Sequence, residues 1–600
     1  MTQADDIQIA EQFAQRPMTR ETFLRLAQFI RPYRKKFFLN LALTILATIS
    51  GLLGPKFIQV AIDRYLTEFT SARMAYTGIL IVSGVYLANL LLGWLLSIAQ
   101  VKSAIAIGQR AMNDMRLRVF EHIQRLSLNY FDKTHQGRII SRADSDIGSL
   151  DQVLTWGANQ MLSSGLTLLG VIAIMVQYDL RLCLATSLVI PFLAVGTRLF
   201  HVHVMQAIRR MIEQGSRVTA AVAENISGVR VVQAFAREGQ NLSRFSLVHG
   251  LYADRLLVVA RIFHTYMPFI ALIAGLGTTI ILGYGGSLVM RNEITVGELA
   301  AFILYLGMFF GPIQTMGDLY NAILSAAASA ERIFQLLDTE PQVVNRPNAA
   351  PLPPVRGHIV FNQVYFRYET TPTDKWILKN INFEAKAGET VALVGATGSG
   401  KTSVISLIAR FYEPQQGRIL MDDIDLQETT VESLRSQIGI VTQENFLFTG
   451  TVMENLKFGQ SSVCDEEVIN AARTLGTHDI ILRLEKGYET KVSERGGNFS
   501  AGERQLITFT RAMVAQPRIL ILDEATSAVD SRTEGLIQHA LEKLFERRTC
   551  FVVAHRLSTV RNAHQILLLR DGEIVERGNH NDLLAHRGMY AKLYEEFVRH

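Results

Sequence analysis

The stretch "VGATGSGKTS", residues 394 to 403, has the residue types and spacing of a loop that binds phosphate groups. It fits the pattern G-x-x-x-x-G-K-[ST], with an apolar strand-like run before it and apolar residues at helical spacing after it. Glycines let backbone N–H groups close around phosphate oxygens, Lys401 reaches the β and γ phosphates, and Thr402 can ligate Mg²⁺. We therefore predict ATP and Mg²⁺ as cofactors. The predicted ATP contacts are Gly395, Ala396, Thr397, Gly398, Ser399, Gly400, Lys401, Thr402 and Ser403.

A second candidate lies in "RILILDEATSAVD", where an apolar run ends in Asp523 and Glu524. A carboxylate at a strand tip beside a phosphate loop is placed to hold Mg²⁺, and the next one can accept a proton from an attacking water. Two acidic residues after a strand are more often a solvated turn, so this prediction depends on the phosphate loop. His555 ends another apolar run, at the sheet edge where nucleotides bind. Together these residues predict ATP hydrolysis.

These motifs need a parallel sheet to position them, and the last part of the chain predicts one. Short β-rich runs such as "TVALVG", "QIGIVTQ" and "RILILD" alternate with helical stretches, which is typical of an α/β domain. A proline-rich stretch precedes it and has no apolar period. We expect a linker over residues 331–355 and a nucleotide-binding domain over 356–600.

The first half of the chain predicts a membrane domain over residues 37–330, after a cytoplasmic segment 1–36. Six of its apolar stretches have the ~20 residues needed to cross a ~30 Å hydrocarbon core. Buried core helices are the alternative, which their length and poverty of charge disfavour. The six predicted spans are approximately 37–62, 75–98, 157–177, 181–200, 266–288 and 297–317.

Two long loops, 99–156 and 201–265, carry most of the arginines between the spans. The positive-inside rule places these loops and both termini in the cytoplasm. The loops have few Gly and Pro residues and a helical apolar period, so we expect the membrane helices to continue into the cytoplasm. Polar breaks at 130–147 and 224–240 predict elbows that contact the nucleotide-binding domain.

Composition agrees with an integral, multi-pass membrane protein. The chain is 48% hydrophobic and only 19% charged, against roughly 25% charged in soluble domains. A net charge of +5 fits basic loops beside apolar segments, so we expect no nucleic-acid partner. The three cysteines are far apart and indicate neither disulfides nor a metal site. We expect a bacterial inner (plasma) membrane protein with a cytoplasmic nucleotide-binding domain.

With these motifs in this order, the chain resembles a half-transporter of the ATP-binding cassette (ABC) family, of the multidrug or lipid exporter type. The resemblance implies a six-helix membrane domain followed by an α/β P-loop ATPase domain. It also implies roles for single residues: Tyr368 stacks on adenine, Asp530 communicates between the two domains of a dimer, and His555 senses the γ-phosphate. Catalytic residues would be Glu524, His555 and Gln443, and Mg²⁺ ligands would be Thr402, Gln443 and Asp523.

The stretch "FSAGE" lies where that family has its signature sequence, usually Leu-Ser-Gly-Gly-Gln. The signature faces ATP bound to the opposite domain, so the resemblance implies that Ser500, Ala501, Gly502 and Glu503 contact a partner's nucleotide. Small residues at a helix start suit this role because backbone and hydroxyl can approach a phosphate. The partner is a second half-transporter subunit. A homodimer is slightly favoured, because every catalytic position is filled, and a heterodimer stays open.

The predicted function is ATP-driven export by alternating access. A membrane-tethered soluble ATPase, an ATP-gated channel, an importer on the same scaffold and a peptide transporter are the alternatives. The spans carry few ionisable residues, and aromatic residues recur in or just before the last two spans. The favoured interpretation is ordinary helix packing; if some of these residues face a cavity, they favour an apolar or amphipathic cargo. These aromatic residues are Phe263, Tyr266, Phe269, Phe302, Tyr305, Phe309 and Phe310. We expect membrane lipids and a drug or lipid substrate as further partners.

Overall fold

The structure is a computed structural model, and it describes residues 20–67, 72–372, 375–523, 531–554 and 557–599. The chain forms two compact units. The first comprises Met1–Glu121 and Ile140–Asp338, and the second comprises His122–Ile139 and Thr339–His600. A short piece of the first long loop therefore belongs to the same unit as the C-terminal half of the chain.

The first unit is helical. Among the described residues it contains six helical stretches long and apolar enough to cross a membrane, which confirms the predicted six spans. Its principal helices are α2 (Arg20–Ile30), α3 (Arg34–Leu52), α4 (Gly54–Ala61), α5 (Ala72–Arg125), α7 (Gln136–Ala143), α8 (Ser145–Asp151), α9 (Ala158–Tyr178), α10 (Leu180–Ser187), α11 (Val189–Ser227), α12 (Val229–Ala234), α13 (Glu238–Ile280), α14 (Gly286–Met290) and α15 (Val296–Leu337).

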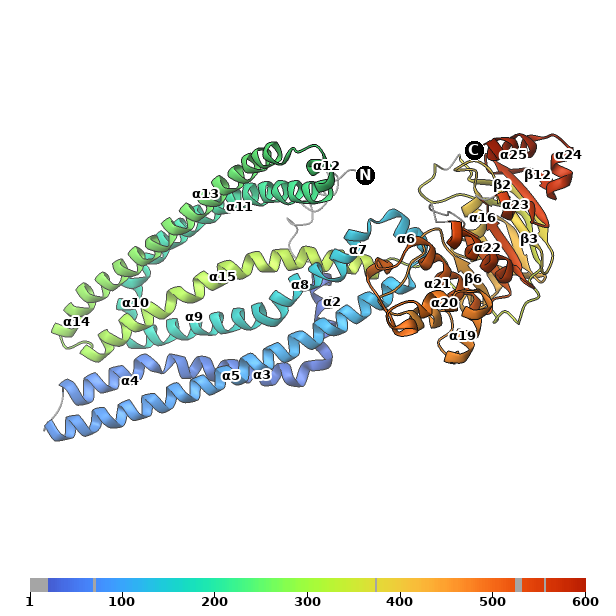
Figure 1. Cartoon of the computed structure of the whole chain (residues 1–600). Coiled ribbons are helices and arrows are strands. Elements are labelled where there is room, and N and C mark those ends of the chain that lie inside the picture. Colours follow the sequence, from blue (N-terminus) through green and yellow to red (C-terminus); the bar gives the residue numbers. More distant parts are fainter. Residues whose placement is uncertain (1–19, 68–71, 373–374, 524–530, 555–556, 600) are drawn as a thin grey trace. The chain divides into compact units, whose positions relative to one another are not determined.

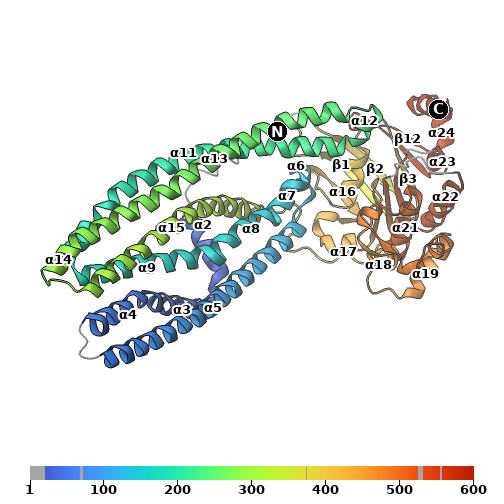
Figure 2. The same ribbon diagram turned by 60° about the vertical axis from the view of Figure 1, so that its left-hand side comes forward.

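Four of these helices, α5, α11, α13 and α15, run far beyond the length of a membrane span. At 1.5 Å rise per residue, the 54 residues of α5 exceed a ~30 Å hydrocarbon core more than twofold. Helices α11 and α13 lie side by side along most of their length, and the short helix α12 turns the chain between them (Figures 1 and 2). The predicted helical extensions are present, and α12 turns the chain within the predicted second elbow; the contact of that elbow with the nucleotide-binding domain stays a prediction.

The membrane-spanning helices bury a common apolar core. Helix α15 packs against α9 and α4, and α3 packs against α9. Phe302 and Tyr305 are each 1% exposed in this core, so these two aromatic residues serve packing, as the sequence favoured. Tyr266 stacks on Phe200 with ring centroids 3.9 Å apart. Many large apolar side chains outside this core are exposed, among them Leu80, Ile81 and Trp94 of α5.

The second unit is an α/β domain built on two main sheets. A six-stranded sheet has the order β12-β11-β3-β10-β9-β6, and a four-stranded antiparallel sheet has the order β2-β1-β4-β5. Strands β3, β6, β9, β10 and β11 are mutually parallel, as predicted. The strand bounds are β1 (Ile359–Phe366), β2 (Leu378–Ala385), β3 (Thr390–Val394), β4 (Gln416–Met421), β5 (Ile424–Asp425), β6 (Ile438–Val441), β7 (Gly450–Thr451), β8 (Lys491–Val492), β9 (Ile519–Asp523), β10 (Thr549–Val553), β11 (Gln565–Arg570) and β12 (Glu573–Gly578).

Helices cover this sheet and connect its strands. They are α16 (Lys401–Ile408), α17 (Val431–Arg435), α18 (Val452–Lys457), α19 (Asp465–Thr474), α20 (His478–Leu482), α21 (Ala501–Val514), α22 (Ser531–Phe545), α23 (Leu557–Arg561), α24 (His580–Ala585) and α25 (Met589–Arg599). The segment His122–Ile139, which also belongs to this unit, contains helix α6 (Leu128–Lys133).

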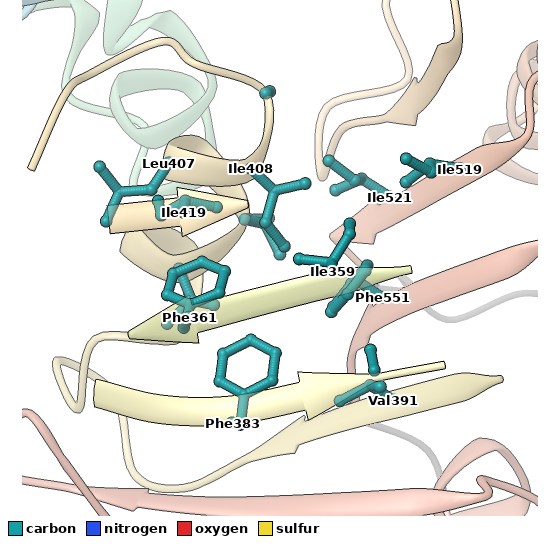
Figure 3. Packing of buried hydrophobic residues seen from close by; sticks show 14 of the residues in the cluster. Ile359, Phe361, Phe383, Val391, Leu407, Ile408, Ile419, Ile519, Ile521 and Phe551 are labelled. Atoms are coloured by element: carbon teal, nitrogen blue, oxygen red, sulfur yellow. The ribbon is translucent and has the colours of Figure 1, made fainter. Parts of the chain in front are cut away.

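The core between the two sheets fixes the strand that leads into the phosphate loop. Every residue of β3 is buried, which matches its continuous apolar sequence. Phe361 stacks on Phe383 at 4.5 Å, and Phe383 contacts Phe551 of β10 (Figure 3). The four-stranded sheet is thus held against the central strands, and β3 has little freedom to move.

Candidate functional site

The loop between β3 and α16 adopts a backbone that glycine favours. Gly395 has φ of 151° and Gly400 has φ of 104°. A Cβ atom at Gly395 would lie 2.2 Å from the carbonyl oxygen of Leu569, and one at Gly400 would lie 2.6 Å from the side chain of Leu378. The chain therefore turns tightly enough for several N–H groups at the start of α16 to converge.

Lys401 lies at the first turn of α16 and is only 7% exposed. Its Nζ donates to the carbonyl oxygens of Gly395 (2.8 Å) and Ala396 (2.9 Å), which holds the ammonium group over the loop. Burial lowers the pKa of Lys401, and the nearby charge of Asp523 opposes that shift. An ammonium group has three donors, so one N–H is left for a phosphate oxygen.

Ser399 supports the fit of the loop to phosphate. Its side-chain oxygen is buried and has no hydrogen-bond partner among the described residues. An unpartnered buried hydroxyl costs free energy, about 1–3 kcal/mol in mutational data. A phosphate oxygen held by the loop would accept its hydrogen bond, so the residues present fit the ligand that the spacing predicts.

The predicted Mg²⁺ ligands follow the carboxyl ends of three parallel strands. Thr402 comes after β3, Asp523 ends β9, and Gln443 lies two residues beyond β6. Strands β9 and β6 are neighbours, and β10 alone separates β9 from β3. Hydroxyl, carboxylate and amide oxygens are ligands that Mg²⁺ accepts, so this donor set fits the ion. Among the described residues no three His, Cys, Asp or Glu side chains form a metal cluster, which leaves this mixed oxygen set as the candidate.

Tyr368 lies just beyond β1 and contacts the phosphate-loop helix. Its hydroxyl and that of Ser403 are 2.9 Å apart, at hydrogen-bond distance. Its ring meets the ring of Tyr412 edge to face, with centroids 5.1 Å apart and planes at 88°. Burial raises the pKa of Tyr368. The structure thus brings the predicted adenine-stacking residue next to the predicted phosphate loop.

Three predicted residues fall outside the described residues: Glu524, Asp530 and His555. Glu524 and Asp530 belong to the stretch that follows β9, and His555 follows β10 by two residues. Their roles remain predictions.

The predicted signature begins helix α21. Ser500 is its N-cap residue, Gly502 is buried, and Ala501 and Glu503 are half-buried. Phe499 is 5% exposed and packs in an apolar cluster with Leu447, Val452 and Ile507. The aromatic residue therefore serves packing, and the exposed Ser500 marks where the helix start is accessible.

Tyr412 and Asp132 are residues that sequence reasoning did not single out. Tyr412 lies shortly after α16, in "ARFYEP", and Asp132 lies in α6. The carboxylate of Asp132 accepts a hydrogen bond from the hydroxyl of Tyr412. An aromatic residue one turn past the phosphate-loop helix was the available signal, but no spacing rule connects it to a residue 280 positions away.

Family comparisons match both parts of the chain. The profile "ABC transporter transmembrane region" matches residues 37–313, and the profile "ABC transporter" matches residues 378–527. The "Uncharacterized ABC transporter ATP-binding protein YknV" of Bacillus subtilis is 37% identical over 586 residues, covering 97% of this chain and 96% of its own length. The chain belongs to the ABC transporter family.

Other relatives of this ABC transporter have more specific names. The "ATP-dependent lipid A-core flippase" of Syntrophus aciditrophicus is 35% identical over 583 residues, covering 96% of this chain and 94% of its own. The "Fatty acid ABC transporter ATP-binding/permease protein" of Mycobacterium bovis is 38% identical over 509 residues, covering 85% and 79%. Each name describes that relative.

A solved structure shares the fold. A bacterial Atm1-family ABC exporter with ATP bound superimposes with a TM-score of 0.78 at 29% identity, covering 94% of this chain and 98% of that one. The ABC transporter is therefore an ATP-hydrolysing transporter of the exporter type. It is a multi-pass membrane protein with a cytoplasmic ATPase domain, and its half-transporter architecture implies a dimer.

Proposed function

We propose that this ABC transporter uses ATP hydrolysis to export an apolar or amphipathic substrate, a drug or a lipid. An apolar cavity in the membrane unit carries this proposal. It has a volume of about 140 Å³ and lies among α9, α10, α11 and α15. The cavity is partly open, and its volume is close to that of an engineered apolar cavity, about 150 Å³, that holds one benzene ring.

The lining of the cavity selects against charge. Thr186 and Ser187 are its polar lining residues, and the other nine are apolar or a cysteine. The hydroxyl of Thr186 donates to the carbonyl of Leu182 and that of Ser187 to the carbonyl of Leu184, so both already have partners. The lining offers an ion no charged side chain, whereas an acyl chain or an aromatic ring needs no polar partner. This cavity is lined by Phe309 and Phe310, two of the aromatic residues identified in the sequence as candidate contacts for an apolar cargo.

The names of the relatives point to the same chemistry. A flippase for lipid A-core, a fatty acid transporter and a "Putative multidrug export ATP-binding/permease protein" of Bacillus subtilis all appear among them. Lipid A and fatty acids both have acyl chains, which an apolar lining can accommodate. A substrate of this kind is therefore the simplest proposal for this chain.

The nucleotide site would act through residues in distinct roles. Lys401 and the loop N–H groups bind the β and γ phosphates, and Tyr368 provides a face for adenine. Thr402, Gln443 and Asp523 would hold Mg²⁺, which neutralises phosphate charge when bound. Glu524 would accept a proton from the attacking water, and His555 would contact the γ-phosphate.

The dimer would supply the rest of each site. Ser500 forms its side-chain hydrogen bond within the first turn of α21, and its exposed position leaves the helix start open to a second chain. We propose that Ser500, Ala501 and Gly502 face ATP on a partner subunit, with Asp530 near the same interface. Two copies of this chain would fill every site position, so we favour a homodimer over a heterodimer.

Substrate-stimulated ATPase activity tests this function. Purified protein in nanodiscs would be titrated with lipids, cationic drugs and peptides, and each stimulating compound would then be followed in inside-out vesicles. We expect lipids or drugs to stimulate hydrolysis and to accumulate in an ATP-dependent way, with Glu524→Gln as the inactive control. Stimulation by peptides alone would favour a peptide transporter. ATP-dependent loss of substrate from inside-out vesicles would favour an importer.

A further inference from the structure

The loop piece in the second unit is fixed to the start of the nucleotide-binding domain. The His122 Nε2 atom lies 3.0 Å from the Thr339 carbonyl oxygen. Asn129 donates to the Gln342 side chain at 2.6 Å, and the Val343 N–H donates to Ser127 Oγ at 2.9 Å. These bonds come from residues before α6 and from its first turn, and they attach the start of α6 to the domain that Figure 1 shows beside it.

Two successive side chains of α6 then reach the surroundings of Tyr368. Asp132 accepts a hydrogen bond from the Tyr412 hydroxyl. Lys133 forms an ion pair with Glu369, the residue that follows Tyr368. Both contacts reach the immediate neighbours of Tyr368. Asp132 bonds to Tyr412, whose ring packs against Tyr368, and Lys133 pairs with Glu369, which follows Tyr368 in the chain.

Tyr412 provides the direct contact to Tyr368. Its ring packs edge to face against Tyr368 and also lies 5.6 Å from Phe366. The pKa of Tyr412 is raised by burial and by the Asp132 carboxylate, so its hydroxyl stays a proton donor at physiological pH. Tyr368 in turn contacts Ser403 in α16. A continuous row of contacts therefore runs from Asp132 through Tyr412 and Tyr368 to Ser403.

We infer that Tyr412 and Asp132 are positioning residues for nucleotide binding. They hold the Tyr368 ring where it stacks on adenine, and they couple adenine binding energetically to α6. This inference rests on the proposed role of Tyr368 as the adenine contact. The physical reason is that a tyrosine ring next to a binding site can rotate about two side-chain bonds. Tyr412 packs edge to face against Tyr368, and its own hydroxyl is held by Asp132. Tyr412 therefore restricts the rotation of the Tyr368 ring.

Because α6 lies in the loop between the second and third spans, the row of contacts joins the base of the nucleotide to that loop. Coupling between two sites is reciprocal in free energy. A change at α6 must therefore alter nucleotide affinity if adenine binding alters α6.

Conservative variants test the inference in full-length protein. Tyr412→Phe keeps the ring and removes the hydroxyl, and Asp132→Asn keeps the shape and removes the charge. The matched control is Tyr33→Phe, because the Tyr33 hydroxyl also donates to a carboxylate, that of Asp114, at 2.8 Å. Unchanged melting temperatures would establish that each variant folds. ATPase rates would be measured with ATP and with CTP, whose smaller base stacks less.

We expect Tyr412→Phe to raise the KM for ATP about twofold to tenfold, the range that loss of one hydrogen bond allows. Asp132→Asn should raise it less, because the amide oxygen still accepts a weaker hydrogen bond. The KM for CTP should change less, so the preference for ATP over CTP falls, and kcat should change little. The double variant should resemble Tyr412→Phe alone, because Asp132→Asn acts only through the hydrogen bond to a Tyr412 hydroxyl that phenylalanine lacks. Tyr33→Phe should keep the wild-type preference. In a Tyr368→Ala background the two variants should have no further effect.

The outcomes separate this inference from the proposed site. If Tyr368→Ala raises the KM for ATP while Tyr412→Phe and Asp132→Asn leave it unchanged, the positioning role is wrong and the site stands. If Tyr368→Ala itself leaves the KM unchanged, the adenine assignment fails and the inference fails with it. Equal increases for ATP and CTP would also overturn the inference, because they would show a general structural effect.

Discussion

Ser500 and Glu503 cap the start of helix α21 reciprocally. The Glu503 N–H donates to the Ser500 hydroxyl at 3.2 Å, and the Ser500 N–H donates to the Glu503 carboxylate at 2.8 Å. This capping box satisfies two N–H groups that a helix start leaves unpaired. The acidic residue in the predicted signature therefore has a local structural role, and its carboxylate is turned back onto the helix start.

Glu503→Gln should separate the charge of this residue from its capping role. Glutamine can form the same capping box, so the helix start is kept while a negative charge beside the proposed ATP phosphates is removed. We expect equal or higher ATPase activity and a lower KM for ATP. Glu503→Ala keeps the Ser500 cap but loses the hydrogen bond from the Ser500 N–H to the carboxylate, and it should reduce stability by about 0.5–1.5 kcal/mol. Steady-state kinetics and thermal unfolding of both variants provide the measurement. A fall in activity for Glu503→Gln would show that the charge itself is required.

Glu524→Gln and Lys401→Ala should fail at different steps. The amide of Glu524→Gln cannot accept a proton from the attacking water, so ATP should bind and remain uncleaved. Lys401→Ala removes the buried ammonium group that bonds to Gly395 and Ala396, so binding itself should weaken. Equilibrium binding of a fluorescent ATP analogue and single-turnover hydrolysis distinguish the two. Hydrolysis by Glu524→Gln at the wild-type rate would remove Glu524 as the base.

The fold was predictable because its signals are local. A membrane span is a long apolar run, a buried parallel strand such as β3 is a short one, and both can be recognised without knowing what they contact. The helical extension of α5 was predictable for the same reason. The assignment of His122–Ile139 to the second unit was not, because it depends on hydrogen bonds to residues more than 200 positions later.

In the candidate site, too, residues that follow a local sequence pattern were predictable, and residues that depend on distant contacts were not. Gly395, Gly400 and Lys401 follow a pattern set by the phosphate they must contact, so spacing alone located them. Tyr412 carries no such pattern, since its position matters only through its contacts with Asp132 and Tyr368. The capping role of Glu503 follows the local pattern Ser-x-x-Glu, which the sequence contains at residues 500–503.

Gly297→Ala should destabilise the membrane unit although it adds a residue that favours helices. The Asp63 carboxylate accepts hydrogen bonds from the Gly297 N–H at 2.8 Å and the Thr295 hydroxyl at 2.7 Å. A Cβ atom at Gly297 would lie 2.6 Å from that carboxylate. Gly307→Ala in the same helix is the control, since a Cβ there meets nothing within 4 Å.

Thermal unfolding in detergent would compare these two variants. We expect a lower melting temperature for Gly297→Ala and an equal or higher one for Gly307→Ala, because alanine favours a helix over glycine by about 1 kcal/mol. Asp63→Ala removes the carboxylate with which the new Cβ atom clashes. The fall in melting temperature caused by Asp63→Ala should therefore be smaller in the Gly297→Ala background than in the wild type. Fully additive losses would show that the two residues do not interact.

Mixing two inactive subunits tests whether the sites are shared between chains. Ser500→Arg adds bulk and positive charge where the helix start should meet a partner's ATP, and it should leave binding at the phosphate loop intact. Lys401→Ala damages the phosphate loop and leaves the helix start intact. Each variant alone, as a homodimer, carries one lesion in both sites. We expect both to lose most ATPase activity, and Ser500→Thr to retain it because threonine keeps the hydroxyl and the cap.

In a mixed dimer the two lesions fall into one site if Ser500 acts on the partner's nucleotide. The other site then combines an intact Lys401 with an intact Ser500, so activity should return above that of either variant alone. If Ser500 acted within its own chain, each site of the mixed dimer would keep one lesion and no activity would return. Co-expression with two different affinity tags isolates the mixed dimer, and its ATPase rate decides between the arrangements. Full activity in monomers separated by size would exclude a shared site directly.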